Sequence, residues 1–395
     1  MQLNFNELTY VIGSPEVVEE MKDLKVLRPF DDLVISFLND LSALLRSNRE
    51  YSDVATFGFW CRKAALLKEK EKYDDIADRF GKGIVFHSTP SNVAVNFAFS
   101  FAAGLLAGNA NIVRLPGKPY EQVDIICAAI KKLLEEQHKE LAPYIVFVKF
   151  PPVKEITDVF SSICNVRVIW GGDMTIAELR QSKIPARTTE ILFADRHSIA
   201  VIDADAYLLE ENKDVLINNF YNDTYYTDQN ACTSPRIIFW QGKNKEEAKA
   251  DFWSRVHKLV ESKYNLAPVH SVGKLTAMYS VAAAKEVKLE KADDMFITRL
   301  SVEKIDKDLM NYKYNCGFYF EKDIDNLEEI VNVCDIKCQT LTYFGVKKED
   351  FENFLDKARP IGIDRIVPIG KSMDFTLVWD GYDLIRQMSK KITII

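Results

Sequence analysis

Apolar residues recur along the chain in two different patterns. Over the first 80 residues they have helical spacing, with Leu33, Phe37 and Leu41 on one face. From residue 83 onward, short apolar runs alternate with longer amphipathic stretches, as in parallel sheets covered by helices. This block predicts strands over 83–87, 111–115, 144–149, 166–170 and 199–202, and helices over 93–107, 121–140, 153–163 and 174–181. We therefore expect an α/β fold with a doubly wound parallel sheet.

A second alternating block follows residue 228. It predicts strands over 236–240, 340–344 and 365–369, and helices over 246–263, 327–333 and 348–357. We expect a first domain over residues 1–205, including the N-terminal helices, a second α/β domain over residues 206–368 and a C-terminal segment over residues 369–395.

Composition and charge exclude several classes of protein. The chain has 395 residues, enough for two or three domains, with a globular balance of 47% apolar and 28% charged residues. A net charge of −7 argues against a nucleic-acid or anionic-membrane binder. The longest apolar stretch, residues 93–108, is shorter than the ~20 residues that a membrane span needs, and we expect no signal peptide.

The seven cysteines are scattered, odd in number and form no CxxC pair, which favours a reduced cytoplasmic protein over a disulfide scaffold. The five histidines show no metal-binding spacing, so we expect no metal site.

Candidate ligand-binding residues lie at the carboxyl ends of three of the predicted strands, because parallel sheets bind ligands at that edge. Ser88, Thr89 and Asn92 follow the first strand and either cap the next helix or line a cofactor crevice. Arg114 ends the second strand, and with Lys118 it either clamps a phosphate or forms a solvated surface pair.

Gly171 and Gly172 follow the fourth of these strands, where they either make a turn or let a ligand approach the backbone. The chain contains no strand–GxGxxG–helix unit, so the usual dinucleotide fingerprint is absent.

Cys232 lies in the polar stretch 228–235, near the expected domain junction. A thiolate near neutral pH needs hydrogen bonds or positive charge, which a polar loop can supply, whereas a buried cysteine is inert. We expect Cys127 and Cys164, on apolar elements, to be inert. His197 either reaches the same crevice or is a hydrogen-bonded structural residue.

Four segments, residues 108–114, 228–235, 364–370 and 379–383, together resemble the aldehyde dehydrogenase superfamily. Within it the chain is most similar to the LuxC-type long-chain acyl-CoA (fatty-acyl) reductases, from about residue 83 to the end. The resemblance implies an aldehyde-dehydrogenase-like fold: a nicotinamide-cofactor domain, a catalytic domain and a small C-terminal segment that packs on the catalytic domain and contacts other subunits of a homo-oligomer.

The resemblance also implies roles for individual residues. Cys232 matches the nucleophile, and Asn92 is similar to the side-chain donor of the oxyanion hole, whose second donor is the Cys232 N–H. Arg114 takes the place of a lysine that contacts the adenosine ribose, and Gly171 and Gly172 take the place of a Gly-Ser at the cofactor diphosphate.

Two positions depart from the superfamily pattern. Residues 193–198 lack the glutamate that activates hydrolytic water, and Glu190 is three residues early, which favours a reductase. Gly117 stands where NAD-preferring relatives often have an acidic residue. Its neighbours Arg114 and Lys118 can attract a 2′-phosphate, so we expect NADPH, with NADH as the alternative.

We therefore expect Cys232 to take an acyl group from acyl-CoA, and the cofactor to reduce the resulting thioester to an aldehyde. An acyl-protein synthetase is a further expected partner, because LuxC-type reductases can receive acyl groups from one. Three alternatives remain open: a short-chain acylating aldehyde dehydrogenase that uses NAD, a cysteine-dependent acyltransferase without a nicotinamide, and a non-catalytic scaffold.

Overall fold

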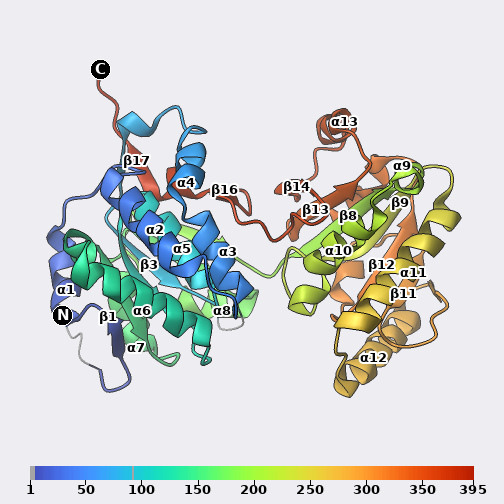
Figure 1. The fold of residues 1–395 in the computed structure, drawn as a ribbon, viewed down its shortest axis with the longest axis horizontal. Helices are drawn as coiled ribbons and strands as arrows, with labels where there is room; N and C mark the ends of the chain where they lie inside the picture. The colour runs from blue at the N-terminus through green and yellow to red at the C-terminus, as the bar shows by residue number, and fades with distance from the viewer. Residues whose placement is uncertain (1–4, 91–92) are drawn as a thin grey trace. The chain divides into compact units, whose positions relative to one another are not determined.

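The computed structural model describes residues 5–90 and 93–395. The chain forms two compact units (Figure 1). The first unit contains the described residues up to Ala194 together with Phe375–Ile395, and the second contains Asp195–Asp374. The first unit is therefore discontinuous in sequence, and the chain passes from one unit to the other twice.

The first unit is built on a six-stranded sheet with the order β1-β5-β4-β3-β6-β7. Its strands are β1 (Thr9–Ile12), β3 (Ile84–Ser88), β4 (Ala110–Arg114), β5 (Ile145–Lys149), β6 (Val166–Trp170) and β7 (Thr189–Phe193). All neighbours are parallel except β1, which pairs antiparallel with β5. The strand order reverses between β3 and β6, which is the position where such sheets bind ligands.

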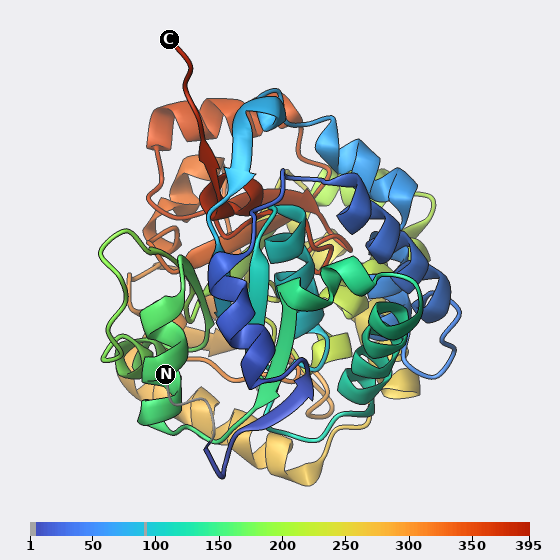
Figure 2. The same cartoon turned by 90° about the vertical axis from the view of Figure 1, so that its left-hand side faces the viewer.

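Helices cover both faces of this sheet, as the side view in Figure 2 shows. One face carries helices α2 (Asp32–Leu45), α3 (Ser52–Trp60), α4 (Lys63–Lys70), α5 (Asn96–Leu106) and α6 (Glu121–Glu136). The other face carries α1 (Pro15–Glu20) and α7 (Lys154–Ile163), and α8 (Asp173–Leu179) follows β6.

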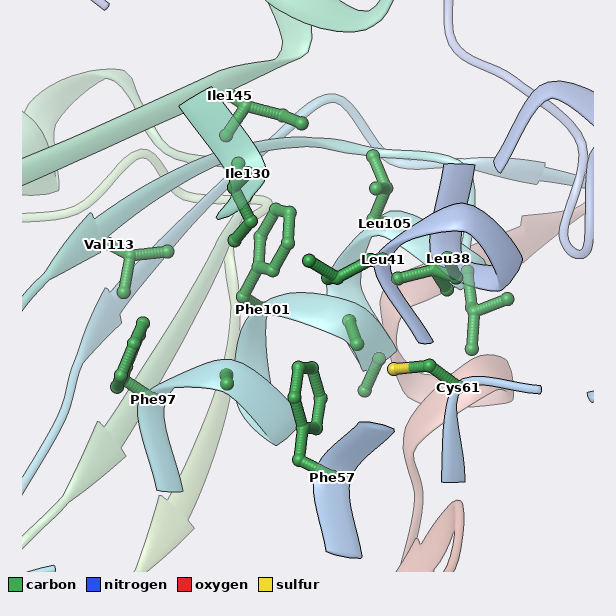
Figure 3. Packing of buried hydrophobic residues seen from close by; sticks show 14 of the residues in the cluster. Leu38, Leu41, Phe57, Cys61, Phe97, Phe101, Leu105, Val113, Ile130 and Ile145 are labelled. Atoms are coloured by element: carbon green, nitrogen blue, oxygen red, sulfur yellow. The ribbon is translucent and has the colours of Figure 1, made fainter. Parts of the chain in front are cut away.

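Helix α5 lies at the centre of the core of the first unit (Figure 3). Its sequence NFAFSFAAGLL is apolar almost all round, which is typical of a helix enclosed on every side. Phe97, Phe101 and Leu105 recur every four residues, and all three are fully buried. The small residues between them let α2 and the sheet pack closely.

The C-terminal residues belong to the first unit, not to the second domain on which we expected residues 369–395 to pack. Leu377, Ile385 and Met388 are buried in the core around α5. The free energy gained by burying these apolar side chains explains why the segment packs there. This segment forms the hairpin β15 (Val378–Trp379)–β16 (Tyr382–Asp383), helix α14 (Leu384–Met388) and strand β17 (Ser389–Lys391), which pairs with β2 (Arg79–Gly81).

The second unit is built on a seven-stranded sheet with the order β10-β11-β12-β9-β8-β13-β14. Its strands are β8 (His197–Asp203), β9 (Pro235–Gln241), β10 (Val287–Leu289), β11 (Thr298–Val302), β12 (Phe318–Asp323), β13 (Cys338–Phe344) and β14 (Arg365–Pro368). β10 is antiparallel to β11, and the other neighbours are parallel. We expected β8 in the first domain, but it lies between β9 and β13, so the division falls before residue 195 rather than after residue 205.

Helices again cover both faces of the second sheet. One face carries α9 (Ala204–Leu209), α10 (Lys213–Asp223) and α11 (Lys245–Lys263). The other carries α12 (Pro268–Ala284), α13 (Lys348–Ala358) and η6 (Leu327–Val333), a 3₁₀ helix at the position where we expected a helix. No helix in the described part of the chain has the length and apolar character needed to cross a membrane.

Candidate active site

Cys232 lies in a short loop between the 3₁₀ helix η4 (Tyr225–Thr227) and strand β9. Asp228 and Gln229 open this loop in the left-handed region, with φ of 53° and 57°. The buried Gln229 amide donates to the carbonyls of Pro235 (3.0 Å) and Phe318 (3.1 Å). Its oxygen accepts from the N–H groups of Gly317 (3.0 Å) and Phe318 (3.1 Å). This one side chain therefore fixes the loop to the start of β12.

Cys232 is partly exposed, whereas the other six cysteines are buried. Its carbonyl accepts a 2.6 Å hydrogen bond from the Ser198 hydroxyl at the start of β8. The same hydroxyl oxygen accepts from the Thr340 N–H (3.2 Å) in β13. Cys232 is thus held at the amino ends of neighbouring parallel strands, with its thiol in the most accessible environment of the seven.

A cation that acts electrostatically on Cys232 is Arg236, the second residue of β9. Its side chain is only 6% exposed, and it interacts electrostatically with the Cys232 thiol and with Asp195. Burial lowers the pKa of this guanidinium, an effect that the two acidic groups oppose. Its Nη1 donates to the Asn315 side chain (2.9 Å) and to the Tyr314 carbonyl (3.4 Å).

The expected cofactor residues meet at the carboxyl edge of the first sheet. Ser88 and Arg114 are paired in register on β3 and β4, and Thr89 donates a 2.6 Å hydrogen bond to the Arg114 carbonyl. The Arg114 guanidinium donates to the Phe150 carbonyl (3.3 and 3.2 Å) and lies 4.5 Å from the centre of the Phe150 ring. Burial lowers the pKa of Arg114. This arginine is therefore held against the end of β5, which leaves it fewer donors for a ligand.

The loops that follow β4 and β6 are open. Gly117, Lys118 and Gly172 are exposed, and a Cβ at either glycine would meet no atom within 4 Å. The Gly171 N–H donates to the Phe193 carbonyl (3.1 Å), which ties this loop to β7. An exposed lysine, hydroxyls and glycine backbone with open space beside it suit the phosphates and ribose of a dinucleotide.

A buried polar chain lies directly behind this edge. His87, in β3, has its Nδ1 2.8 Å from the Ser100 hydroxyl and its Nε2 3.0 Å from the Asn111 side-chain oxygen. Trp170, at the end of β6, donates to Ser100 (3.1 Å). Burial lowers the pKa of His87 to about 4, so its ring is neutral at physiological pH.

The remaining candidates have other positions. Asn92 lies outside the described residues. Glu190 accepts from Arg167 at 3.0 and 2.6 Å, so it is the ion-pair partner of a buried arginine. His197 is buried, with its Nε2 2.9 Å from the Val333 carbonyl, which fits the structural alternative. Among the described residues, no group of His, Cys, Asp or Glu has a metal-binding arrangement.

Three residues that shape this loop, Ser198, Gln229 and Arg236, have no role among the expectations from the sequence. A signal for Arg236 was present, because a charged residue at the start of the apolar run RIIFW needs a partner. No comparable signal marks Ser198 or Gln229, since most of their hydrogen-bond partners lie far away in sequence.

Comparisons with known proteins bear on both the family and the fold. A family model described as "Acyl-CoA reductase (LuxC)" matches residues 22–391. The chain is 22% identical to a long-chain acyl-protein thioester reductase from Vibrio harveyi over 325 residues, which cover 80% of this chain and 64% of that protein.

Among solved structures, an NAD-dependent benzaldehyde dehydrogenase from Corynebacterium glutamicum matches with a TM-score of 0.64 at 12% identity, over 99% of this chain and 95% of its own. An indole-3-acetaldehyde dehydrogenase complexed with NAD+ matches with a TM-score of 0.66 at 11% identity, over 95% and 86%. At these identities the structural matches establish the fold, which is aldehyde-dehydrogenase-like.

Proposed function

Because this chain belongs to the acyl-CoA reductase (LuxC) family, we propose that it reduces an acyl thioester to an aldehyde through a covalent intermediate on Cys232. One observation carries the proposal: Cys232 is the partly exposed cysteine, in a loop fixed by Gln229 and Ser198. A rigid, accessible thiol beside a buried guanidinium has the properties of a nucleophile, whereas buried cysteines do not.

The proposed reaction begins when the Cys232 thiolate attacks the thioester carbonyl. The carbon–sulfur bond to the leaving thiol breaks, that thiol takes up a proton, and the acyl group stays on Cys232. A reduced nicotinamide, when bound, supplies the hydride that reduces this thioester. Collapse of the resulting thiohemiacetal releases the aldehyde and returns the electron pair to the Cys232 sulfur.

We propose that the carboxyl edge of the first sheet holds the cofactor, with Ser88, Thr89, Gly171 and Gly172 near its phosphates. Lys118 is exposed at that edge and, with Arg114, favours a 2′-phosphate, so we propose NADPH over NADH. Asn92, with the Cys232 N–H, is the proposed oxyanion donor, and one such donor contributes roughly 3 kcal/mol to transition-state binding in comparable enzymes.

The acyl donor is proposed as acyl-CoA or an acylated protein, since the Vibrio harveyi relative is a reductase of acyl-protein thioesters. An acyl-protein synthetase partner, a homo-oligomer and a cytoplasmic location complete the proposal. The last is supported by seven cysteines that are all free of disulfides.

The experiment mixes radiolabelled acyl-CoA with the wild type, Cys232→Ala and the matched control Cys127→Ala. We expect covalent label on the wild type and the control but none on Cys232→Ala, and release of labelled aldehyde on addition of NADPH. Normal labelling of Cys232→Ala would refute the nucleophile. Label without reduction by NADPH or NADH would identify an acyltransferase instead.

A further inference from the structure

Arg236 is a buried cation whose surroundings differ from those of other buried arginines. The other buried arginine, Arg167, is paired with Glu190 at 2.6 Å, and the partly buried Arg299 is paired with the buried Glu321 at 2.9 Å. Such pairing is the rule, because an uncompensated buried charge destabilises the fold. Within the described residues, Arg236 forms no ion pair of this kind, and its hydrogen-bond acceptors are the neutral Asn315 side chain and the Tyr314 carbonyl.

The guanidinium of Arg236 also has an unused donor. Its Nε atom is buried and has no hydrogen-bond partner among the residues that the structure describes. The acidic groups that act on it electrostatically are the Cys232 thiol, four residues earlier, and the partly exposed carboxyl of Asp195. Asp195 already contacts the ammonium of Lys313 at 3.3 and 3.2 Å, so Arg236 is not the only cation near that carboxylate.

The loop geometry keeps this pair together. Ser198 holds the Cys232 carbonyl and Gln229 holds the Pro235 carbonyl, on either side of the turn that leads into Arg236. We infer that Arg236 is a positioning residue that acts through Cys232, as the fixed counter-charge of its thiolate. This inference rests on the proposed function, because it deepens the account of the same nucleophile.

The assignment has a chemical consequence. A guanidinium keeps its proton throughout the working pH range, so it can stabilise a thiolate but cannot remove the proton as a base. Ionisation of Cys232 would then depend on Arg236, Asp195 and Lys313, with Asp195 opposing the two cations. The reaction would need no histidine–cysteine pair, in keeping with the structural position of His197.

The experiment measures the rate at which iodoacetamide alkylates Cys232 in the full chain as a function of pH, followed by mass spectrometry of the peptide that contains it. We compare the wild type with Arg236→Gln, Arg236→Lys and the control Arg299→Gln. The midpoint of the curve of alkylation rate against pH marks the ionisation of the thiol. In Arg236→Gln we expect this midpoint to rise by at least about one pH unit, which means roughly tenfold less thiolate at pH values below both midpoints. Arg236→Lys should recover most of that loss, and Arg299→Gln should match the wild type.

A second measurement needs no variant. Iodoacetate is anionic and iodoacetamide is neutral. A nearby guanidinium should therefore raise the rate of alkylation by iodoacetate, divided by the rate with iodoacetamide, above the value of this ratio for free cysteine. A folded Arg236→Gln with the wild-type midpoint, or a wild-type rate ratio equal to that of free cysteine, would overturn the inference.

Neither measurement uses a substrate, so failure of the inference and failure of the proposed function are distinguishable. A wild-type Cys232 that titrates like free cysteine but still forms the acyl-enzyme would overturn the role of Arg236 alone. A midpoint that depends on Arg236 without any acyl-enzyme would support that role and reject the reaction.

Discussion

His87 is the buried histidine of the first sheet, and its ring bridges Ser100 and Asn111. A neutral imidazole satisfies both neighbours as one donor and one acceptor, whereas protonation would place an unpaired charge in the core. Ser100 also accepts a hydrogen bond from Trp170 at the end of β6. Through Ser100, His87 therefore links β3 to β6, two strands that border the proposed cofactor edge.

The pH dependence of stability follows from this environment. The pKa of His87 is lowered from 6.5 to about 4, so the unfolded chain binds its proton more readily than the folded chain does. The stabilisation is complete above pH 6.5 and is lost as the pH falls toward 4, by up to roughly 3 kcal/mol. We expect the wild type to lose more stability than His87→Gln between pH 7 and 4.5, measured as the melting temperature at each pH. Equal losses in both proteins would contradict the assignment.

Individual residues also mark where sequence-based inference ends. Arg114 and Arg236 both stand out in the sequence as charges attached to apolar strands. The sequence suggested a phosphate for Arg114, but the structure adds the Phe150 carbonyl and ring, which come from the end of a neighbouring strand. Contacts across a sheet depend on the order of its strands, and this order could not be inferred from the single sequence.

At the scale of elements, several buried central strands were predictable because continuous apolar runs between helices have few alternatives. β3, β4, β5, β6 and β9 all match the expected strands to within two residues. The edge strands β1, β7 and β10, the inner strands β11 and β12, and the helices α10 and α12 were missed. Strands of three or four residues give little periodic signal, and α12 buries few of its side chains, so it lacks a marked apolar stripe.

Helix α14 provides a test of how the C-terminal segment stabilises the first unit. Ile385 is fully buried against the core around α5, whereas Ile394 is 94% exposed. We expect Ile385→Ala to lower the free energy of unfolding by about 2–4 kcal/mol, through lost burial and a residual cavity. The matched control Ile394→Ala should change it by less than about 0.5 kcal/mol. Denaturant titrations that give equal values for the two variants would contradict this packing.

At the scale of the whole molecule, the two units differ in how the chain builds them. The second unit is one continuous stretch, Asp195–Asp374, with its own sheet and cores on both faces. The first unit takes its last residues from the far end of the chain. Sequence patterns indicated two domains and located the second block of strands. They did not indicate that residues 375–395 pack in the first unit, because this packing joins side chains more than 250 residues apart in sequence, such as Phe101 and Met388.

Fragments should therefore behave differently. We expect residues 195–374 alone to fold cooperatively, and residues 1–194 alone to expose the apolar surface that Leu377, Ile385 and Met388 cover. Joining residues 375–395 to residue 194 through a flexible Gly/Ser linker should restore a cooperative thermal transition, followed by circular dichroism. Cooperative melting of residues 1–194 without that segment would show that the core is complete without it.

This division of the first unit has a consequence for biosynthesis. The ribosome synthesises residues 375–395 after the whole second unit, so the core around α5 stays incomplete while the second unit emerges and can already fold. For that interval the nascent chain presents an uncovered apolar surface to its surroundings, which makes it a substrate for chaperones that act during translation.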